Sequence, residues 1–190
     1  MLPALNFEPA LLLRAQGAGL GMKAAIFDVD GVLTDGRIYI GEHGETVKAF
    51  ATLDGHGLKL LRQGGIEPLV ITGRDSAAVR RRVADLGLAH AVYGAHDKLA
   101  AATTLLAALG LGWDEVAAMG DDWPDLPLLA RAAFACAPVN AHAEVKALAH
   151  HVTALRGGFG AAREFCDLLL IAAGRYAGLL QGQLNTLDGA

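Results

Sequence analysis

"AAIFDVDGVLTDG", residues 24–36, is the stretch from which the rest of the chain can be interpreted. Four apolar or small residues lead directly into Asp28 and Asp30, and Gly31 follows. The apolar run has the length of a buried strand, yet it ends in two carboxylates, which are costly to bury unless another group pairs with them. The pattern therefore predicts a strand whose end carries a charged site with a counter-charge nearby.

The composition predicts one folded domain. The chain has 190 residues, of which 53% are hydrophobic and 19% are charged. It can therefore form a substantial hydrophobic core, and its composition is not that of a disordered protein. The net charge of -4 gives no general attraction to nucleic acid or to an anionic membrane, so we expect neither partner. The two cysteines, Cys136 and Cys166, are far apart and indicate reduced thiols in a cytoplasmic protein.

The first 21 residues form a separate extension in this interpretation. Their pattern predicts a short amphipathic helix followed by a glycine-containing link. The apolar run 10–13 is too short for an export signal, and no stretch approaches the roughly 20 apolar residues that span a bilayer. We expect a cytoplasmic protein with its domain at residues 22–180 and a flexible tail at 181–190.

From Lys23 onward, short apolar runs alternate with longer amphipathic segments. Strands are predicted in the runs 24–27, 68–72, 91–94, 116–120 and 134–138. Helices are predicted within 55–65, 75–87, 98–110, 125–133 and 160–180. This alternation is typical of an α/β fold with a doubly wound, Rossmann-like parallel sheet. One interruption, at about residues 36–50, predicts an inserted β-hairpin where a crossover helix would otherwise begin.

Polar groups gather where the predicted strands end, and ligands of open α/β sheets bind at that edge. These groups are Asp28 and Asp30, Thr72-Gly73-Arg74-Asp75, Asp97-Lys98, and Gly120-Asp121-Asp122. Carboxylates outnumber cations, and oxygen ligands of this kind suit Mg²⁺. Asp28 can then attack a phosphate monoester, with Asp30 as acid and base and with Thr72 and Gly73 holding the phosphoryl oxygens. Arg74 is either a substrate contact or a solvated residue of a first helical turn.

The segments "DVDGVLTDG", "ITGRDS", "DKL" and "GDDWPDL", in this order, resemble the four motifs of haloacid dehalogenase-type phosphatases. The resemblance implies a magnesium-dependent phosphatase in which Asp28 is the nucleophile, Asp30 the acid/base, and Lys98 the charge-balancing lysine. Thr72 would bind the phosphoryl group. The implied metal ligands are Asp28, the backbone carbonyl of Asp30, and Asp121. Whether Asp122 or Asp125 also contacts the metal stays open.

Residues 22–180 further resemble the small-capped subfamily that hydrolyses 3-deoxy-D-manno-octulosonate 8-phosphate for lipopolysaccharide synthesis. This likeness implies a homotetramer in which the hairpins pack together and sites lie at subunit boundaries. The segment "RGGFGAAREF" supplies Arg156 and Arg163 as candidates to pair with a sugar carboxylate. Phe159 stands there where relatives often carry a basic residue. Two alternatives remain: a phosphatase for a nine-carbon keto-acid sugar phosphate, and a non-catalytic scaffold with this fold.

Overall fold

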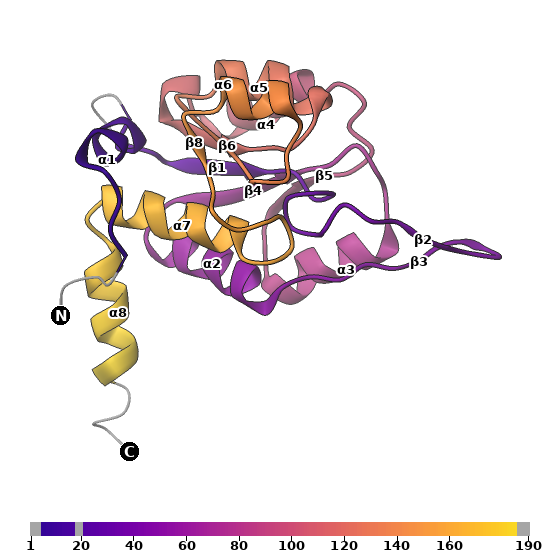
Figure 1. Cartoon of the computed structure of the whole chain (residues 1–190), viewed down its shortest axis with the longest axis horizontal. Helices are drawn as coiled ribbons and strands as arrows, with labels where there is room; N and C mark the ends of the chain where they lie inside the picture. The colour runs from indigo at the N-terminus through magenta and orange to yellow at the C-terminus, as the bar shows by residue number, and fades with distance from the viewer. Residues whose placement is uncertain (1–4, 18–20, 186–190) are drawn as a thin grey trace.

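The computed structural model describes residues 5–17 and 21–185, and its centre is a parallel sheet of six strands (Figure 1). The strands lie in the order β5-β4-β1-β6-β7-β8. Their bounds are β1 (Ala24–Phe27), β4 (Glu67–Ile71), β5 (His90–Val92), β6 (Val116–Met119), β7 (Phe134–Ala137) and β8 (His151–Val152). The prediction of a doubly wound α/β fold is confirmed.

Strand β1 is where the order of the strands reverses. It pairs in parallel with β4 on one side and with β6 on the other, so that Phe27 lies beside both Val70 and Met119. All four residues of β1 are buried. In doubly wound sheets the ligand site lies at such a reversal, beyond the carboxyl ends of the strands. The residue that follows β1, Asp28, therefore emerges at the position where a site is expected.

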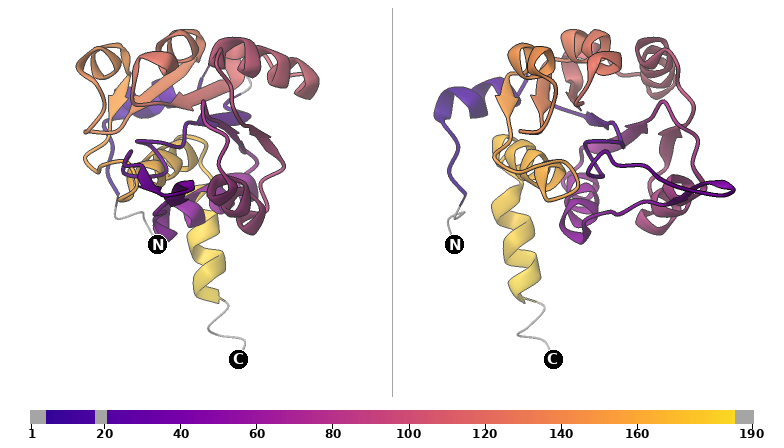
Figure 2. Two further views of the ribbon diagram at one scale, coloured as in Figure 1. Left: turned by 90° about the vertical axis from the view of Figure 1, so that its right-hand side faces the viewer. Right: turned by 45° about the vertical axis from the view of Figure 1, so that its right-hand side comes forward.

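Helices cover both faces of the sheet, as Figures 1 and 2 show. One face carries α2 (Thr52–Gln63), α3 (Ala77–Leu86) and α7 (Ala161–Ala172), and the other carries α4 (Lys98–Leu109), α5 (Leu126–Arg131) and α6 (Ala143–Leu148). Two short 3-10 helices, η1 (Trp113–Glu115) and η2 (Trp123–Asp125), flank β6. Each face has its own hydrophobic core, and Phe27, Phe134 and Phe165 are fully buried on the α7 side. These two cores fix the sheet edge on which the polar residues lie.

The inserted hairpin predicted at about residues 36–50 is present as β2 (Tyr39–Gly41) and β3 (Gly44–Val47), which pair antiparallel. It extends away from the body of the protein (Figure 1). It exposes three large apolar side chains, since Tyr39, Ile40 and Val47 are 45%, 77% and 58% exposed. Strand β8 and helix α6 were not predicted. Strand β8 has only two residues in the sheet, which is too short to produce a periodic pattern.

The C-terminal segment differs from the prediction of a single helix over 160–180. The chain forms α7 and then α8 (Tyr176–Asn185), separated at residues 173–175, where Gly174 has a φ of 68°. Helix α8 has no buried residue; Tyr176 and Leu179 in its first turn pack against the core, and the rest of the helix projects from the domain (Figure 2). Residues 181–185 of the predicted flexible tail belong to this helix, and 186–190 lie outside the described residues.

The predicted N-terminal helix is present as α1 (Pro9–Ala15). Its last residue, Ala15, is 1% exposed and joins the core on the α7 side. Arg14 contacts the ring of His150, which further attaches this extension to the domain. The link at residues 18–20 and residues 1–4 lie outside the described part. Within residues 5–17 and 21–185, no helix has the length and apolar character needed to traverse a lipid bilayer.

Candidate active site

A cleft of about 430 Å³ opens at the carboxyl ends of β1, β4 and β6. Seven residues proposed from the sequence line it: Asp28, Asp30, Thr72, Gly73, Arg74, Lys98 and Asp121. Ala95, His96, Asp122, Pro124 and Asp125 complete most of its wall. Segments that are more than 90 residues apart in the sequence thus share one hollow because parallel strands end at the same edge of the sheet.

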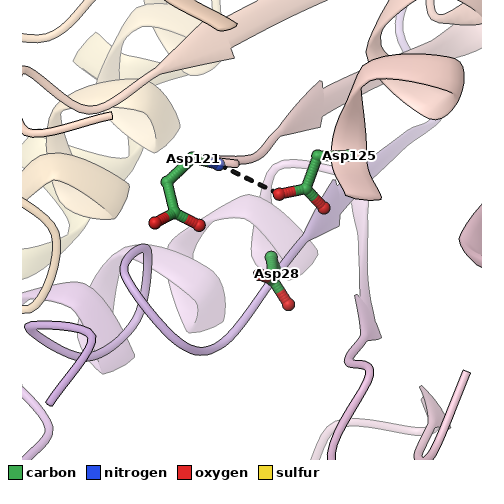
Figure 3. Close-up of side chains that lie close together, drawn as sticks. All are labelled: Asp28, Asp121 and Asp125. Atoms are coloured by element: carbon green, nitrogen blue, oxygen red, sulfur yellow. Dashed lines mark hydrogen bonds between the residues drawn. The ribbon is translucent and has the colours of Figure 1, made fainter. Parts of the chain in front are cut away.

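Three carboxylates meet in this cleft (Figure 3). Asp28, Asp121 and Asp125 each offer one oxygen, and these oxygens all lie within 4.8 Å of one another. The loops that carry them are in close contact, because a Cβ atom at Gly31 would lie 1.9 Å from Oδ2 of Asp121. Gly31 also has a φ of 90°, which favours glycine. Only glycine therefore allows the loop after β1 to approach Asp121 this closely.

Lys98 is the cation that faces this cluster. Its ammonium lies 2.9 Å from Oδ1 of Asp28 and 2.6 Å from Oδ1 of Asp125, and the residue is only 6% exposed. Helix α4 begins at Lys98, and the Asp97 side chain caps it by accepting the N–H of Ala100. Burial alone would lower the pKa of Lys98, but Asp28 and Asp125 raise it, so the side chain stays charged.

Asp125 has a structural role in the same cluster. While its Oδ1 accepts from Lys98, its Oδ2 accepts the backbone N–H of Asp121 at 3.0 Å and that of Asp122 at 3.3 Å. The two backbone bonds fix the loop after β6, and Figure 3 shows the one from Asp121. The Asp121 carboxylate, by contrast, accepts no hydrogen bond from the described residues, 5–17 and 21–185. Asp121 is therefore the carboxylate that remains available to a ligand.

The electrostatics of the cluster favour the binding of a further positive charge. Burial, followed by repulsion from Asp125, raises the pKa of Asp28 to about 7. Burial and repulsion from Asp28 raise the pKa of Asp121 to about 8. Three neighbouring acids share the single ammonium of Lys98, and their donors are all oxygen atoms. This donor set fits a hard divalent cation such as Mg²⁺, whose charge would allow both carboxylates to ionise at neutral pH.

The phosphate-binding candidates lie across the cleft, after β4. Thr72 is buried, with its backbone held by Val92 and Ala95 and its hydroxyl accepting the N–H of Arg74 at 3.3 Å. The Arg74 side chain is 52% exposed and reaches back toward Asp30, with Nε 4.0 Å from Oδ2. A hydroxyl, backbone N–H groups and a guanidinium are therefore available to an anionic ligand in front of Asp28.

The structure also reveals two residues that the sequence pattern did not identify. Lys48, directly after β3, forms an ion pair with the Asp30 carboxylate, and it also lies 3.3 Å from Glu45. No spacing rule relates residue 48 to residue 30, because the contact depends on how the hairpin folds back. The only sequence signal was a pair of opposite charges, Glu45 and Lys48, three residues apart around the end of the second hairpin strand.

Arg156 and Arg163 are not among the residues that line this cleft. Arg163 lies on α7, where its Nε donates to both oxygens of Asp167 at 2.8 and 2.9 Å. Arg156 is exposed, and the loop that it begins packs on the loop after β1. A Cβ atom at Gly157 would lie 1.7 Å from the carbonyl oxygen of Gly31, and Gly158 donates its N–H to Val32. The loop that begins at Arg156 therefore supports the loop after β1, which carries Asp28 and Asp30.

The chain is similar in sequence to known hydrolases. A sequence profile of haloacid dehalogenase-like hydrolases matches residues 92–157. The 3-deoxy-D-manno-octulosonate 8-phosphate phosphatase KdsC of Yersinia pestis is 41% identical over 157 residues, which cover 83% of this chain and 84% of that protein. The chain belongs to the haloacid dehalogenase-like hydrolases. This confirms the resemblance seen in the four sequence motifs.

Two solved structures extend the comparison of this hydrolase. A probable YrbI family phosphatase from Pseudomonas syringae superposes with a TM-score of 0.88 at 45% identity, covering 93% of this chain and 98% of that one. The 3-deoxy-D-manno-octulosonate 8-phosphate phosphatase of Moraxella catarrhalis, in complex with magnesium, phosphate and KDO, gives 0.85 at 37% identity, with coverages of 91% and 97%. The hydrolase described here is a phosphoric monoester hydrolase.

Proposed function

We propose that this hydrolase removes the phosphate of 3-deoxy-D-manno-octulosonate 8-phosphate in the cytoplasm, as a step in lipopolysaccharide precursor synthesis. The observation that carries the proposal is the cleft in which Asp28, Asp121 and Lys98 meet opposite Thr72 and Arg74. The likeness to the Moraxella catarrhalis phosphatase that binds magnesium, phosphate and KDO supports the substrate. The buried, unpaired thiols of Cys136 and Cys166 suit a reducing compartment.

The proposed reaction uses Asp28 as nucleophile. A carboxylate oxygen of Asp28 forms a bond to phosphorus while the bond from phosphorus to the ester oxygen breaks. Asp30 gives its proton to the departing sugar alkoxide and then takes a proton from the water that cleaves the aspartyl-phosphate. Thr72 and the N–H groups near Gly73 hold the phosphoryl oxygens, and Lys98 keeps Asp28 oriented.

The proposed metal ligands are Asp28, the backbone carbonyl of Asp30, and Asp121. Mg²⁺ bound there would reduce the repulsion between the Asp28 carboxylate and the anionic phosphate. Asp125 would act indirectly, because both of its oxygens already accept hydrogen bonds from Lys98 and from the loop after β6. This indirect role concerns Asp125; Asp122, the other acid that the sequence left open, lines the cleft beside it.

We also propose a homotetramer with active sites at subunit boundaries. The hairpin projects from the domain with three exposed apolar side chains, a surface that is unfavourable in water and that another subunit can cover (Figure 1). No segment of the described chain is large enough to act as a lid over the cleft. A neighbouring subunit would exclude water and place Arg156 or Arg163 near the substrate carboxylate.

The deciding experiment measures phosphate release from the eight-carbon 8-phosphate and from a nine-carbon keto-acid sugar 9-phosphate, each with and without Mg²⁺. The proposal expects the eight-carbon ester to have the higher kcat/KM, and activity to be lost in EDTA and restored by Mg²⁺. A higher kcat/KM for the nine-carbon ester would overturn the eight-carbon assignment and make the nine-carbon ester the preferred substrate. Full activity without a divalent ion would overturn the metal assignment.

A further inference from the structure

Lys48 is enclosed between two carboxylates. Its side chain has 0% exposure, and its ammonium contacts Oδ1 of Asp30 and lies 3.3 Å from Oε2 of Glu45. Lys48 is not among the residues that line the cleft. A bound substrate would therefore contact Asp30 and not Lys48. Any effect of Lys48 on the reaction would pass through the carboxylates that it contacts.

The contacts of Glu45 explain why Lys48 is held in place. Glu45 accepts a hydrogen bond from the hydroxyl of Ser76 and lies 3.8 Å from Nη1 of Arg74. Burial alone would raise the pKa of Glu45, but the bond from Ser76 and the charge of Lys48 lower it, so this carboxylate is ionised at neutral pH. Strand β3 is thus anchored to the loop after β4.

The two oxygens of Asp30 face different cations. Lys48 holds Oδ1, and Arg74 lies 4.0 Å from Oδ2 with half of its side chain exposed. A buried lysine with a second carboxylate partner is a fixed point, whereas an exposed arginine can move to a ligand. When Arg74 turns to an anionic substrate, Lys48 remains as the contact that keeps the direction of the Asp30 side chain.

We propose that Lys48 is a positioning residue that aims the Asp30 carboxylic group at the leaving oxygen of the ester. The inference rests on the proposed function, in which Asp30 protonates the sugar alkoxide. An alkoxide is a poor leaving group, so this proton must be delivered as the bond from phosphorus to oxygen breaks, and delivery requires hydrogen-bond reach. Lys48 neither gives nor receives a proton in this step.

The test compares esters that differ in their need for that proton. We would measure kcat/KM for an alkyl phosphate monoester and for p-nitrophenyl phosphate, whose leaving phenolate is stable without protonation. In the Lys48→Met variant, the alkyl ester should lose about 100-fold in kcat/KM, and p-nitrophenyl phosphate less than about threefold. Because kcat/KM reports only the steps through phosphoryl transfer, later hydrolysis of the aspartyl-phosphate does not blur the comparison.

Three controls make the result decisive. Lys23→Met, at an exposed lysine directly before β1 and so at the end of that strand opposite the cleft, should leave both esters unchanged. Asp30→Asn should show the same selective loss as Lys48→Met, and if it does not, the proposed role of Asp30 fails instead. If Lys48→Met does not fold, Lys48→Arg keeps the charge with a different reach, and it should still slow the alkyl ester more than the aryl ester. Equal losses for both esters, with Asp30→Asn remaining selective, would overturn the role of Lys48.

Discussion

The Asp54 carboxylate on α2 accepts the backbone N–H of Arg163 at 2.8 Å, in the first turn of α7. It also accepts the N–H of Gly160 at 3.2 Å and is only 2% exposed. One side chain therefore satisfies two free donors at the start of a helix that it does not belong to. Burial raises the pKa of Asp54 although these bonds oppose the shift.

Replacing Asp54 should lower stability through this cap. Asp54→Ala leaves two buried N–H groups without an acceptor, which costs about 2 kcal/mol. For a chain of this length that corresponds to a decrease in Tm of roughly 4–8 °C. Asp54→Asn keeps an oxygen acceptor and loses the buried charge, so its Tm should fall less. Thermal unfolding followed by circular dichroism measures both, and equal Tm values for wild type and Asp54→Ala would show that the cap contributes nothing.

Removing the nucleophile should abolish turnover and leave the fold intact. Asp28→Asn keeps the size of the side chain but provides no carboxylate to attack phosphorus, so phosphate release should drop by more than about 1000-fold. Asp85→Asn is the matched control, because Asp85 lies on the surface of α3 and pairs with the exposed Arg81. Phosphate release by Asp28→Asn at the wild-type rate would disprove the assignment.

The raised pKa values in the cleft predict how the metal-free protein responds to pH. The pKa values of Asp28 and Asp121 rise from 3.8 to about 7 and about 8, so the folded state keeps protons that the unfolded chain has lost. Stability is then greatest at acidic pH for these groups and falls as the pH rises from about 4 to about 8. Melting curves in EDTA across this range measure the slope, and Asp121→Asn should make it shallower.

The same groups predict that Mg²⁺ binding releases protons near pH 7. A divalent cation favours the ionised carboxylates, so protons held by Asp28 and Asp121 must leave as the metal binds. Calorimetric titration with Mg²⁺ in two buffers of different ionisation enthalpy should give different apparent binding enthalpies. Identical enthalpies in the two buffers would mean that both groups are already ionised before the metal arrives.

The exposed hairpin predicts a specific disruption of assembly. Light scattering of the wild type should give about four times the mass of one chain. Ile40→Asp places a charge at a side chain that is 77% exposed, so it should produce smaller species without unfolding the domain. Leu13→Asp, at a 67% exposed position on α1, is the control and should leave the mass unchanged. A wild-type protein that is a monomer at micromolar concentration would refute the tetramer.

The two late arginines should behave differently when replaced. Arg156→Ala removes an exposed side chain and should raise KM for the sugar phosphate several-fold without changing Tm. Arg163→Ala removes the partner of buried Asp167 and should lower Tm by a few degrees. Steady-state kinetics and melting curves on the same preparations separate the two effects. An unchanged KM in both variants would exclude a substrate contact for this segment.

The catalytic acids could be predicted from the sequence because each is tied to the end of a strand. Asp28 follows β1 and Asp121 follows the strand paired with it, so parallel pairing alone brings them together. Lys98 could be predicted for a similar reason, as a cation at the start of a helix where it is unfavourable without acidic partners. For these residues, the local sequence was sufficient to predict that they meet, because the sheet determines where each of them lies.

Features that depend on how loops fold back could not be predicted. The contact from Lys48 to Asp30 requires the hairpin to return to the sheet, and the support of Gly31 by Gly157 joins segments far apart in the chain. The interruption between α7 and α8 at Gly174 was missed because the apolar pattern continues across it.

Val47 and Lys48 are consecutive residues with opposite environments, one 58% exposed on the hairpin and the other with no exposed side-chain surface. A substitution that remodels the outer side of this hairpin changes the backbone one peptide bond away from the group that holds Asp30. A new contact surface can therefore evolve on this strand only if turnover is kept. Among natural variants, changes in the outer surface of the hairpin should accompany changes in the rate of turnover.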